Sequence, residues 1–288
     1  MFLNWLMLAT VILGLIVQSV SQKTFNMKTS GGVFTFGAAY SLFAALFFVA
    51  TSGFKLEFTV GVLIYSIFFS LGYATSVVGL FLAIKTGPLS LTTLINSLSL
   101  LIPTLYCLIV LKEPIKVSLI IGLVLLLVAL VMINLKKKGE EKKVNFKWVI
   151  FVLLAFFGNG SCALVQKMQV QEYGSDYMHE FMIMALLLVF LSLGTVAVFT
   201  ERKLIKPGLR GAPWFMLCGI FNGICNLLVM ILSKPDSGMN SSVMFPVISG
   251  GDMVLTFIIS RFFYKEKLTR TQDIGFILGV LSIIALNL

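Results

Sequence analysis

The chain of 288 residues is 58% hydrophobic and 12% charged, with a mean hydropathy of +1.01, so it is far more apolar than a soluble globular domain. Its net charge of +10 would suit a nucleic-acid partner in a soluble protein, but lysine and arginine in a membrane protein mostly report topology, and we expect no nucleic-acid partner. Continuous apolar runs, in place of alternation with a period of two, argue against a transmembrane β-barrel.

Ten apolar segments follow one another along the chain, each close to the roughly 20 residues that a helix needs to cross a bilayer. The first five are predicted near residues 2–21, 33–51, 58–83, 89–111 and 118–135. The second five are predicted near residues 148–166, 180–199, 212–233, 240–262 and 272–288. Because these segments use most of the chain, no sizeable soluble domain is expected. The first segment has a matching copy at 148–166, so a cleaved signal peptide is not expected either.

A short motif recurs in the first segment of each half. Residues 14–23 read GLIVQSVSQK and residues 158–167 read GNGSCALVQK, so each copy has a glycine at its start and a glutamine–lysine pair at its end. We therefore divide the chain into a first five-helix repeat at 1–137, a basic linker at 138–147 and a second repeat at 148–288. Because five crossings are an odd number, the second repeat must run through the membrane in the opposite direction. The predicted fold is an all-α integral membrane protein, with ten transmembrane helices as two inverted five-helix repeats around a central cavity, a construction typical of secondary transporters.

The basic residues are unevenly distributed between the two sides of the membrane. When successive loops between the segments are placed on alternate sides of the membrane, most of the 22 lysine and arginine residues fall on one side. That basic side is expected to be cytoplasmic, because cytoplasmic loops carry an excess of lysine and arginine. The chain is thus predicted to be a multi-pass protein of the cell membrane, with its basic odd-numbered loops in the cytoplasm and both termini outside.

Polar side chains within the first half form helical faces that we expect to line the cavity. Gln18 lies four residues from both Gly14 and Gln22, so the three share one face of the first segment. Tyr73 in the third segment and Asn96 in the fourth are further polar residues at membrane depth. Since amides in hydrocarbon need hydrogen-bonding partners, these faces are predicted to converge on a bound solute.

The second half offers Asn159, Asn222 and Asn226, of which the last two are four residues apart on the eighth segment. We expect these amides to hydrogen-bond the same solute. Lys23 and Lys167 are the last residues of the two copies of the repeated motif. Because the second repeat is inverted, one lysine would lie at each mouth of the cavity, where they could act as gates. The alternative is that both lysines extend their ammonium groups to the membrane interface.

Asp252 lies near the middle of the ninth segment, where an ionised carboxylate is costly unless it faces a cavity or a partner. Pro246, Ser249, Gly250 and Gly251 precede it. These residues are expected to loosen the helix, because proline removes a backbone donor and glycine weakens helical structure. We predict that Asp252 and Ser249 belong to the solute-binding site, with the carboxylate binding a cationic group or exchanging a proton. The alternative is an aspartate that only holds a hydrogen bond between packed helices.

The sequence shows none of the patterns that catalysis, metals or cofactors need. It contains no recognisable nucleophile–base pair, glycine-rich phosphate loop or metal-ligand spacing, and its single histidine, His179, lies at a membrane boundary. We therefore expect no enzyme activity, no catalytic residue, no metal and no cofactor. The four cysteines fall inside predicted helices, where they are expected to be small packing residues.

The fifth and tenth segments are almost wholly apolar, which predicts that they lie away from the solute pathway. Gly122 in the fifth segment, with Gly275 and Gly279 in the tenth, are small residues that let helices approach closely, and Gly219 and Gly223 do the same in the eighth. A homodimer through the fifth and tenth helices is one arrangement that such surfaces would suit. The other expected partners are the small-molecule solute and the lipid bilayer.

Each half ends with a charged turn, KEP at 112–114 and KEK at 265–267, followed by a last segment that contains glycine, and the run from AIKTGPLS to IPTLY occupies 83–106. These features, spread over the whole chain, resemble the EamA-like family of the drug/metabolite transporter superfamily. The resemblance implies ten helices, a central cavity and alternating access. Many relatives are placed with both termini in the cytoplasm, opposite to the charge count. The small multidrug-resistance branch couples protons through a glutamate in its first helix, but segments one and six contain no acidic residue here.

We therefore expect a secondary transporter that moves a small polar or amphipathic metabolite across the cytoplasmic membrane. Uptake of a neutral, sugar-like solute is an alternative, since amide-rich walls would suffice and Asp252 would accept a hydroxyl. A second alternative is a non-transporting membrane scaffold or subunit, in which the polar faces satisfy one another within the helix bundle.

Overall fold

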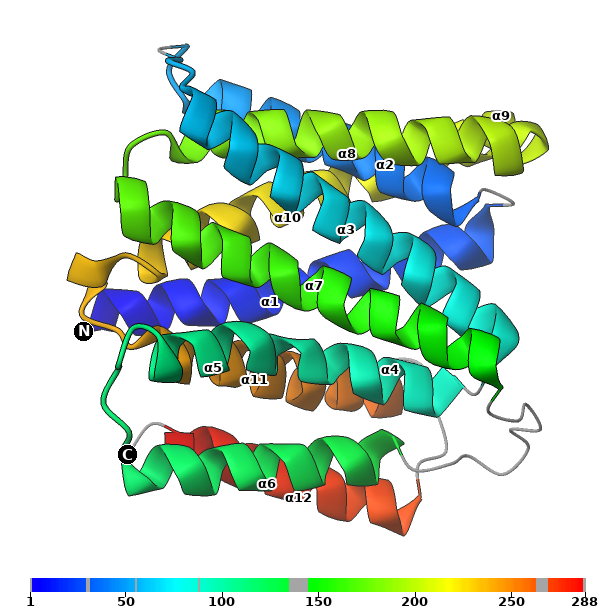
Figure 1. Cartoon of the computed structure of the whole chain (residues 1–288). Coiled ribbons are helices and arrows are strands. Elements are labelled where there is room, and N and C mark those ends of the chain that lie inside the picture. The colour runs from blue at the N-terminus through cyan, green and yellow to red at the C-terminus, as the bar shows by residue number, and fades with distance from the viewer. Residues whose placement is uncertain are drawn as a thin grey trace. The chain divides into compact units, whose positions relative to one another are not determined.

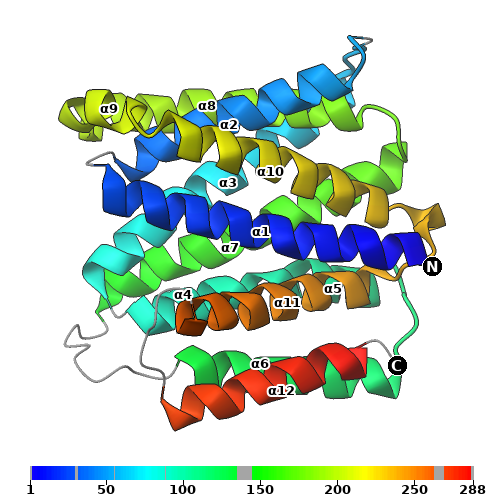
Figure 2. The ribbon, with the colours of Figure 1, turned by 180° about the vertical axis from the view of Figure 1, so that it is seen from behind.

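The structure, a computed structural model, describes residues 2–29, 32–54, 56–87, 89–134, 145–262 and 269–286. These residues form helices and connecting turns without a β-strand (Figure 1, Figure 2). The helices are α1 (Phe2–Lys28), α2 (Val33–Thr51), α3 (Val60–Thr86), α4 (Leu89–Ser97), η1 (Leu98–Leu100), α5 (Leu101–Ile109), α6 (Val117–Asn134), α7 (Phe146–Tyr173), α8 (Met178–Thr200), α9 (Arg202–Leu209), α10 (Ala212–Leu232), η2 (Pro235–Ser237), α11 (Ser241–Phe262) and α12 (Arg270–Leu286). The charged turn at 265–267 and most of the linker predicted at 138–147 lie outside the described residues.

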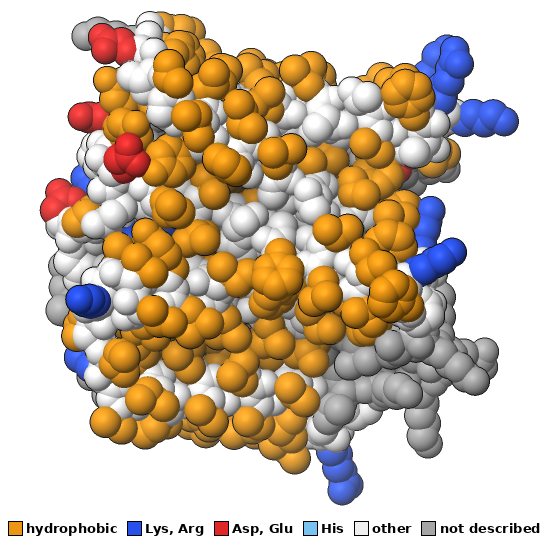
Figure 3. All heavy atoms as spheres, viewed as in Figure 1, with side chains coloured by type: hydrophobic (Ala, Val, Ile, Leu, Met, Phe, Trp, Pro, Cys, Tyr) orange, Lys and Arg blue, Asp and Glu red, His pale blue; other side chains and the backbone are white. Residues whose placement is uncertain are grey.

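Eight helical stretches in the described part of the chain are long and apolar enough to cross a membrane. Large hydrophobic side chains are exposed along them, and Figure 3 shows such side chains over most of the face it views. An exposed apolar surface of this extent suits contact with lipid. The chain is therefore a multi-pass, all-helical membrane protein, as predicted. The fifth and tenth predicted segments form α6 and α12, which have 18 and 17 residues.

The fourth predicted segment is not one continuous α-helix. It consists of α4 and α5 joined by the 3₁₀ turn η1, and Pro103 follows this turn in α5. Because proline lacks a backbone N–H, the helical hydrogen bond to the carbonyl of Ser99 cannot form, which favours a break at this point.

The residues predicted to loosen the backbone before Asp252 do not interrupt the helix, because α11 runs through residues 246–251 without a break. Gly250 faces neighbouring helices: a methyl group built on it would lie 3.3 Å from the side chain of Leu126 in α6 and 3.2 Å from that of Ile283 in α12. The glycine therefore serves close helix packing and does not interrupt α11.

The chain forms two compact units. Unit 1 comprises residues 1–77 and 165–238, and unit 2 comprises residues 78–164 and 239–288. The long helices α3 and α7 contribute to both, since each contains one of the boundaries. Each unit combines parts of both predicted halves, and the division into repeats at 1–137 and 148–288 stays a prediction.

Glycines lie at close helix contacts in unit 1, where α10 packs against α1 and α2. A methyl group built on Gly219 would lie 2.6 Å from both the carbonyl oxygen of Tyr40 and Cβ of Phe43 in α2. Gly223, one turn later, faces the ring of Phe47 in the same helix. The glycines predicted to pack in the eighth segment therefore bring α10 onto α2.

Replacing Gly219 with alanine should destabilise the protein, because the new methyl group would overlap backbone atoms of α2. We expect a loss of about 1–3 kcal/mol in the free energy of unfolding, the usual cost of overpacking. Gly194 in α8 is the matched control, since the only atom described within 4 Å of a methyl group there is Cβ of Ala38, at 4.0 Å. Gly194→Ala should be neutral or stabilising by up to about 1 kcal/mol. Denaturation curves of the two purified variants check this contrast, and equal losses would contradict it.

Glycines also lie at the close contacts between α6 and α12 in unit 2. A methyl group built on Gly275 would lie 2.9 Å from Cβ of Met132, and one on Gly122 would lie 2.6 Å from Cγ of Leu286. One on Gly279 would meet Met253 of α11. The three glycines predicted to serve packing therefore lie at helix contacts, and the fifth and tenth predicted helices are direct neighbours.

Candidate functional site

Four amide side chains of unit 1 form a continuous chain of hydrogen bonds. Gln166 of α7 donates from Nε2 to Oδ1 of Asn226 at 2.7 Å, and Asn226 Nδ2 donates to Oδ1 of Asn222 at 3.0 Å. Asn222 Nδ2 donates in turn to Oε1 of Gln18 in α1, also at 3.0 Å. The structure thus brings together three of the predicted site residues, Gln18, Asn222 and Asn226, and adds Gln166, which sequence reasoning had not selected as a ligand.

Local geometry explains why these four amide side chains bond to one another. Asn222 and Asn226 are four residues apart, so they share one face of α10. A methyl group on Gly14 would overlap Sγ of Cys225, so the glycine lets α1 approach α10 closely enough for Gln18 to reach its partner. Gln166 is buried, whereas the other three amides are partly exposed. Their mutual bonds satisfy polar groups that would otherwise be costly in an apolar surrounding.

A double-mutant cycle should detect the bond between Gln18 and Asn222. We expect Gln18→Leu and Asn222→Leu each to cost about 1–2 kcal/mol in the free energy of unfolding, because each leaves a partner unpaired. Their coupling energy should be about 0.5–1.7 kcal/mol, the range found for polar contacts between membrane helices. Gln22, one turn beyond Gln18, is exposed and gives the control. Gln22→Leu combined with Asn222→Leu should be additive, and coupling of similar size in both cycles would refute the pairing.

Tyr73, also predicted to bind solute, lies in an aromatic group of unit 1. Its ring stacks on Phe69 with centroids 5.9 Å apart and meets Tyr40 edge-on at 6.4 Å. Phe69 in turn contacts Phe181 of α8. The aromatic ring of Tyr73 therefore helps hold α3 to its neighbours, and its role in binding stays a prediction.

Unit 2 presents a second polar stripe, between α4–η1 and the first part of α7. Trp148 Nε1 donates to Oγ1 of Thr92 at 2.9 Å, and Asn159 Nδ2 donates to Oγ of Ser99 at 2.6 Å. Asn96 lies on the same face as Thr92 and Ser99, because the three are spaced i, i+4 and i+7. Its Oδ1 is buried and has no hydrogen-bond partner among the described residues. The stripe therefore contains one unpaired acceptor.

Asp252 supplies a second unpaired acceptor in unit 2. It is partly buried in α11 and accepts a hydrogen bond from Thr256, one turn later. Its Oδ1 is buried and no described residue donates to it. A buried polar atom without a partner is costly, and an ionised carboxylate can only accept hydrogen bonds. Such an oxygen suits a ligand that donates hydrogen bonds or carries positive charge.

Ser249 lies three residues before Asp252 and borders a small cavity of unit 2. The cavity has room for about one water molecule. Its walls come from α4, η1, α5, α6 and α11 and consist mainly of leucine, with Ser97 and Ser249 as polar members. A metabolite does not fit in this space, so the binding role of Ser249 stays a prediction.

The two predicted gate residues have different surroundings. Lys167 is only 3% exposed, and its Nζ donates to the backbone carbonyl of Ser233, just after α10, at 2.7 Å. A cation is favourable at a helix C-terminus. The alternative in which both lysines extend to the interface is therefore wrong for Lys167, which holds the end of α10. Lys23 is partly exposed on α1, and gating by either lysine stays a prediction.

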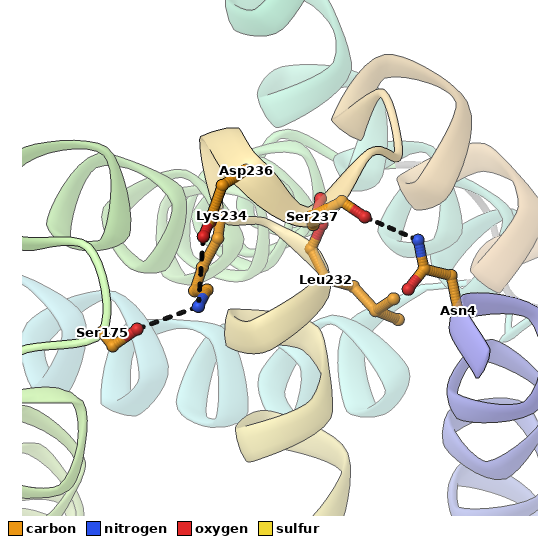
Figure 4. Close-up of polar contacts among 6 residues, drawn as sticks. All are labelled: Asn4, Ser175, Leu232, Lys234, Asp236 and Ser237. Carbon is orange, nitrogen blue, oxygen red and sulfur yellow. Dashed lines mark hydrogen bonds and ion pairs between the residues drawn. The ribbon is translucent and has the colours of Figure 1, made fainter. Parts of the chain in front are cut away.

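The turn after α10, at residues 233–238, forms side-chain hydrogen bonds with two other parts of unit 1 (Figure 4). Asn4 Nδ2, at the start of α1, donates to the carbonyl of Ser237 at 2.7 Å. Lys234 Nζ donates to Oγ of Ser175 at 2.9 Å and lies 3.7 Å from Oδ2 of Asp236. Sequence reasoning missed these contacts, because most of them join residues that are far apart in the chain.

Two glutamates cap the N-termini of helices that are distant from them in the sequence. Glu201 accepts hydrogen bonds from the backbone N–H groups of Phe34 and Thr35 in α2, at 3.2 and 2.9 Å. Glu113, in the charged turn after α5, accepts from the first two N–H groups of α11, at 3.2 and 2.8 Å. A carboxylate satisfies unpaired donors there and interacts favourably with the helix dipole. These residues position α2 and α11, the helix that carries Asp252.

Metal ligation has no support in the described residues, where no three His, Cys, Asp or Glu side chains lie close enough to share an ion. The four cysteines are buried, and none of them forms a disulfide with a described residue. The candidate polar groups are amides in unit 1, and amides, hydroxyls and one carboxylate in unit 2.

Three comparisons relate the chain to known proteins. Residues 146–288 match the model of the EamA-like transporter family. An uncharacterized protein of Haemophilus influenzae is 26% identical over 195 residues, and the match covers 66% of this chain but only 63% of that protein. A protein crystal structure with 15% sequence identity aligns at a TM-score of 0.78 over 98% of this chain and 95% of that chain. At this identity, the structural likeness shows the fold alone.

Proposed function

Since the chain belongs to the EamA-like transporter family of the drug/metabolite transporter superfamily through residues 146–288, we propose that it is a secondary transporter. It moves a small polar or amphipathic metabolite across the cell membrane by alternating access. The observation that carries the proposal is the buried, unpaired Oδ1 of Asp252 in a membrane-spanning helix. Intramembrane carboxylates of this kind are typical of solute and ion pathways.

In the proposed architecture, ten helices cross the membrane as two inverted five-helix repeats around a central cavity. Helices α6 and α12 complete the set, because their 18 and 17 residues correspond to about 27 and 26 Å, close to the roughly 30 Å of the hydrocarbon core. The matched glycine and lysine positions of α1 and α7 support the inversion. The exposed isoleucines of α6 and α12 would contact lipid or a second copy of the chain in a homodimer.

The roles of the polar residues follow from their hydrogen bonds. Asp252 and Asn96, whose acceptor oxygens are unpaired, bind the donor or cationic group of the solute. The amides of Gln18, Asn222 and Asn226 exchange their mutual bonds for bonds to the solute's polar groups, and Asn159 acts in the same way from α7. Moving an intact solute needs no catalytic residue, metal or cofactor, so we propose none.

The proposed orientation places the basic ends of the helices in the cytoplasm. In unit 1, Lys28 at the end of α1 lies 5.3 Å from the ring of Trp214 at the start of α10, close to the basic helix α9. In unit 2, Asn145 bonds the carbonyl of Thr86, near Lys85. The positive-inside rule then places both chain termini outside.

Two alternatives rest on specific observations. A neutral, sugar-like solute would suit the amide-rich surfaces, with Asp252 accepting a hydroxyl. A non-transporting scaffold would suit the amide chain of unit 1, in which all four side chains already have partners. The unpaired oxygens of Asn96 and Asp252 favour a solute over the scaffold.

A thermal-shift screen of the purified full chain tests the proposal. Amino acids, sugars, nucleosides and cationic amphiphiles are added separately, and a transporter should be stabilised by at least one class. A ligand at 100 times its Kd stabilises a protein by about 2.7 kcal/mol, which is easily measured. Stabilisation by sugars alone would select the sugar-like alternative, and no stabilisation by any class would favour the scaffold.

A further inference from the structure

Helix α9 of unit 1 has a basic face that is exposed on the surface of the unit. It packs on α8 and α2. Glu201, Ile205 and Gly208 are spaced i, i+4 and i+7 and are buried or partly buried, so they mark its inward face. The outward face and the residue after it carry four exposed cations: Arg202, Lys203, Lys206 and Arg210.

This positive charge is uncompensated within the described chain. None of the four cations forms an ion pair with a described acidic residue. The neighbouring Glu201 is only 7% exposed, and its carboxylate is held by the N-terminus of α2. Lys28, whose ammonium lies over the ring of Trp214, adds a fifth exposed cation at this end of unit 1.

Large apolar side chains are exposed beside these cations. Phe199 is 83% exposed, Met27 71% and Leu209 56%. Figure 3 shows basic side chains projecting next to hydrophobic ones at the α9 end of unit 1. Where membrane-spanning helices end, apolar side chains enter the acyl boundary while cations stay at the level of the headgroups. The combination is typical of a helix that lies in the membrane interface.

We propose that α9, together with Lys28, is a docking surface for anionic phospholipid headgroups. Charge complementarity selects the occupant, because phosphate oxygens accept hydrogen bonds from lysine and arginine while a zwitterionic headgroup offers no net attraction. The proposed cytoplasmic position of α9 matches the leaflet that carries anionic lipid. This inference rests on the proposed orientation and does not depend on what, if anything, the protein transports.

The test measures how anionic lipid stabilises the full chain in detergent. Phosphatidylglycerol is titrated into the purified protein, and the concentration that gives half of the maximal rise in melting temperature is recorded. Lys203→Gln/Lys206→Gln should raise that concentration roughly tenfold or more, since each juxtamembrane lysine strengthens binding severalfold. Phosphatidylcholine should give no difference between this variant and the wild type.

Lys112→Gln/Lys116→Gln is the matched control, because it removes the same charge from two exposed lysines of unit 2. It should leave the titration unchanged, and Lys203→Arg/Lys206→Arg should also bind like the wild type. The melting temperature in phosphatidylcholine alone reports whether each variant is folded. Equal weakening by both glutamine pairs would overturn the proposal in favour of a general effect of net charge. An unchanged titration of the α9 pair would overturn it directly.

Discussion

Replacing Asp252 with asparagine should strongly weaken stabilisation by the solute while leaving the melting temperature of the solute-free protein unchanged or higher. The reason is that Oδ1 of Asp252 is buried and unpaired, and an ionised carboxylate in that place costs more stability than a neutral amide. The same carboxylate would provide a charge-assisted bond to the solute, worth about 1.5–3 kcal/mol. We therefore expect solute affinity to fall by about one to two orders of magnitude, measured as the shift in ligand-dependent melting curves.

The control for this prediction is Asp273→Asn in the same unit. Asp273 forms an exposed ion pair with Arg261, and such pairs contribute about 0–1 kcal/mol. This variant should keep solute binding and lose little stability. A large loss of stability in Asp252→Asn, with solute binding retained, would show that the carboxylate holds the helix bundle together and does not bind solute.

Replacing Glu201 with glutamine should lower the free energy of unfolding by about 2–3 kcal/mol, which is more than an ordinary helix cap contributes. The carboxylate accepts three hydrogen bonds, from the backbone of Phe34 at 3.2 Å and from the backbone and Oγ1 of Thr35, both at 2.9 Å. Glutamine retains one acceptor oxygen, turns an NH₂ group toward donors and removes the charge that favours a helix N-terminus. Denaturation of the purified variant measures the loss.

Glu57→Gln makes the same chemical change at an exposed residue and should be close to neutral. If both glutamate variants lose the same stability, or if Glu201→Gln loses none, the buried cap does not stabilise α2. If only Glu201→Gln loses stability, the cap is confirmed as the device that fixes the start of this helix.

The helices could be predicted from sequence because their signal is local. A run of about 20 apolar residues is enough to identify a crossing, and small residues at helical spacing identify close contacts. Gly219 and Gly275 lie at such contacts. The 3₁₀ turn η1 lies just before Pro103, whereas α11 runs through Pro246 without a break, although both prolines lie in apolar segments. Composition alone does not distinguish these two cases.

The candidate site was partly predictable for the same reason. Asn222 and Asn226 stood out because a spacing of four puts both on one face, and Asp252 because a carboxylate is rare at membrane depth. The caps made by Glu113 and Glu201 could not be predicted, since their partners lie 128 and 167 residues away in the chain. Such contacts arise only once the helices have packed.

Counterflow in proteoliposomes tests the central claim, transport by alternating access, most directly. Vesicles that contain the full chain are loaded with the solute found in the thermal-shift screen, and uptake of labelled solute is followed over time. The proposed mechanism predicts transient accumulation above protein-free vesicles by the wild type, loss of that accumulation in Asp252→Asn across the pH range, and retention of it in Asp273→Asn. Binding of the solute without any counterflow by the wild type would contradict it.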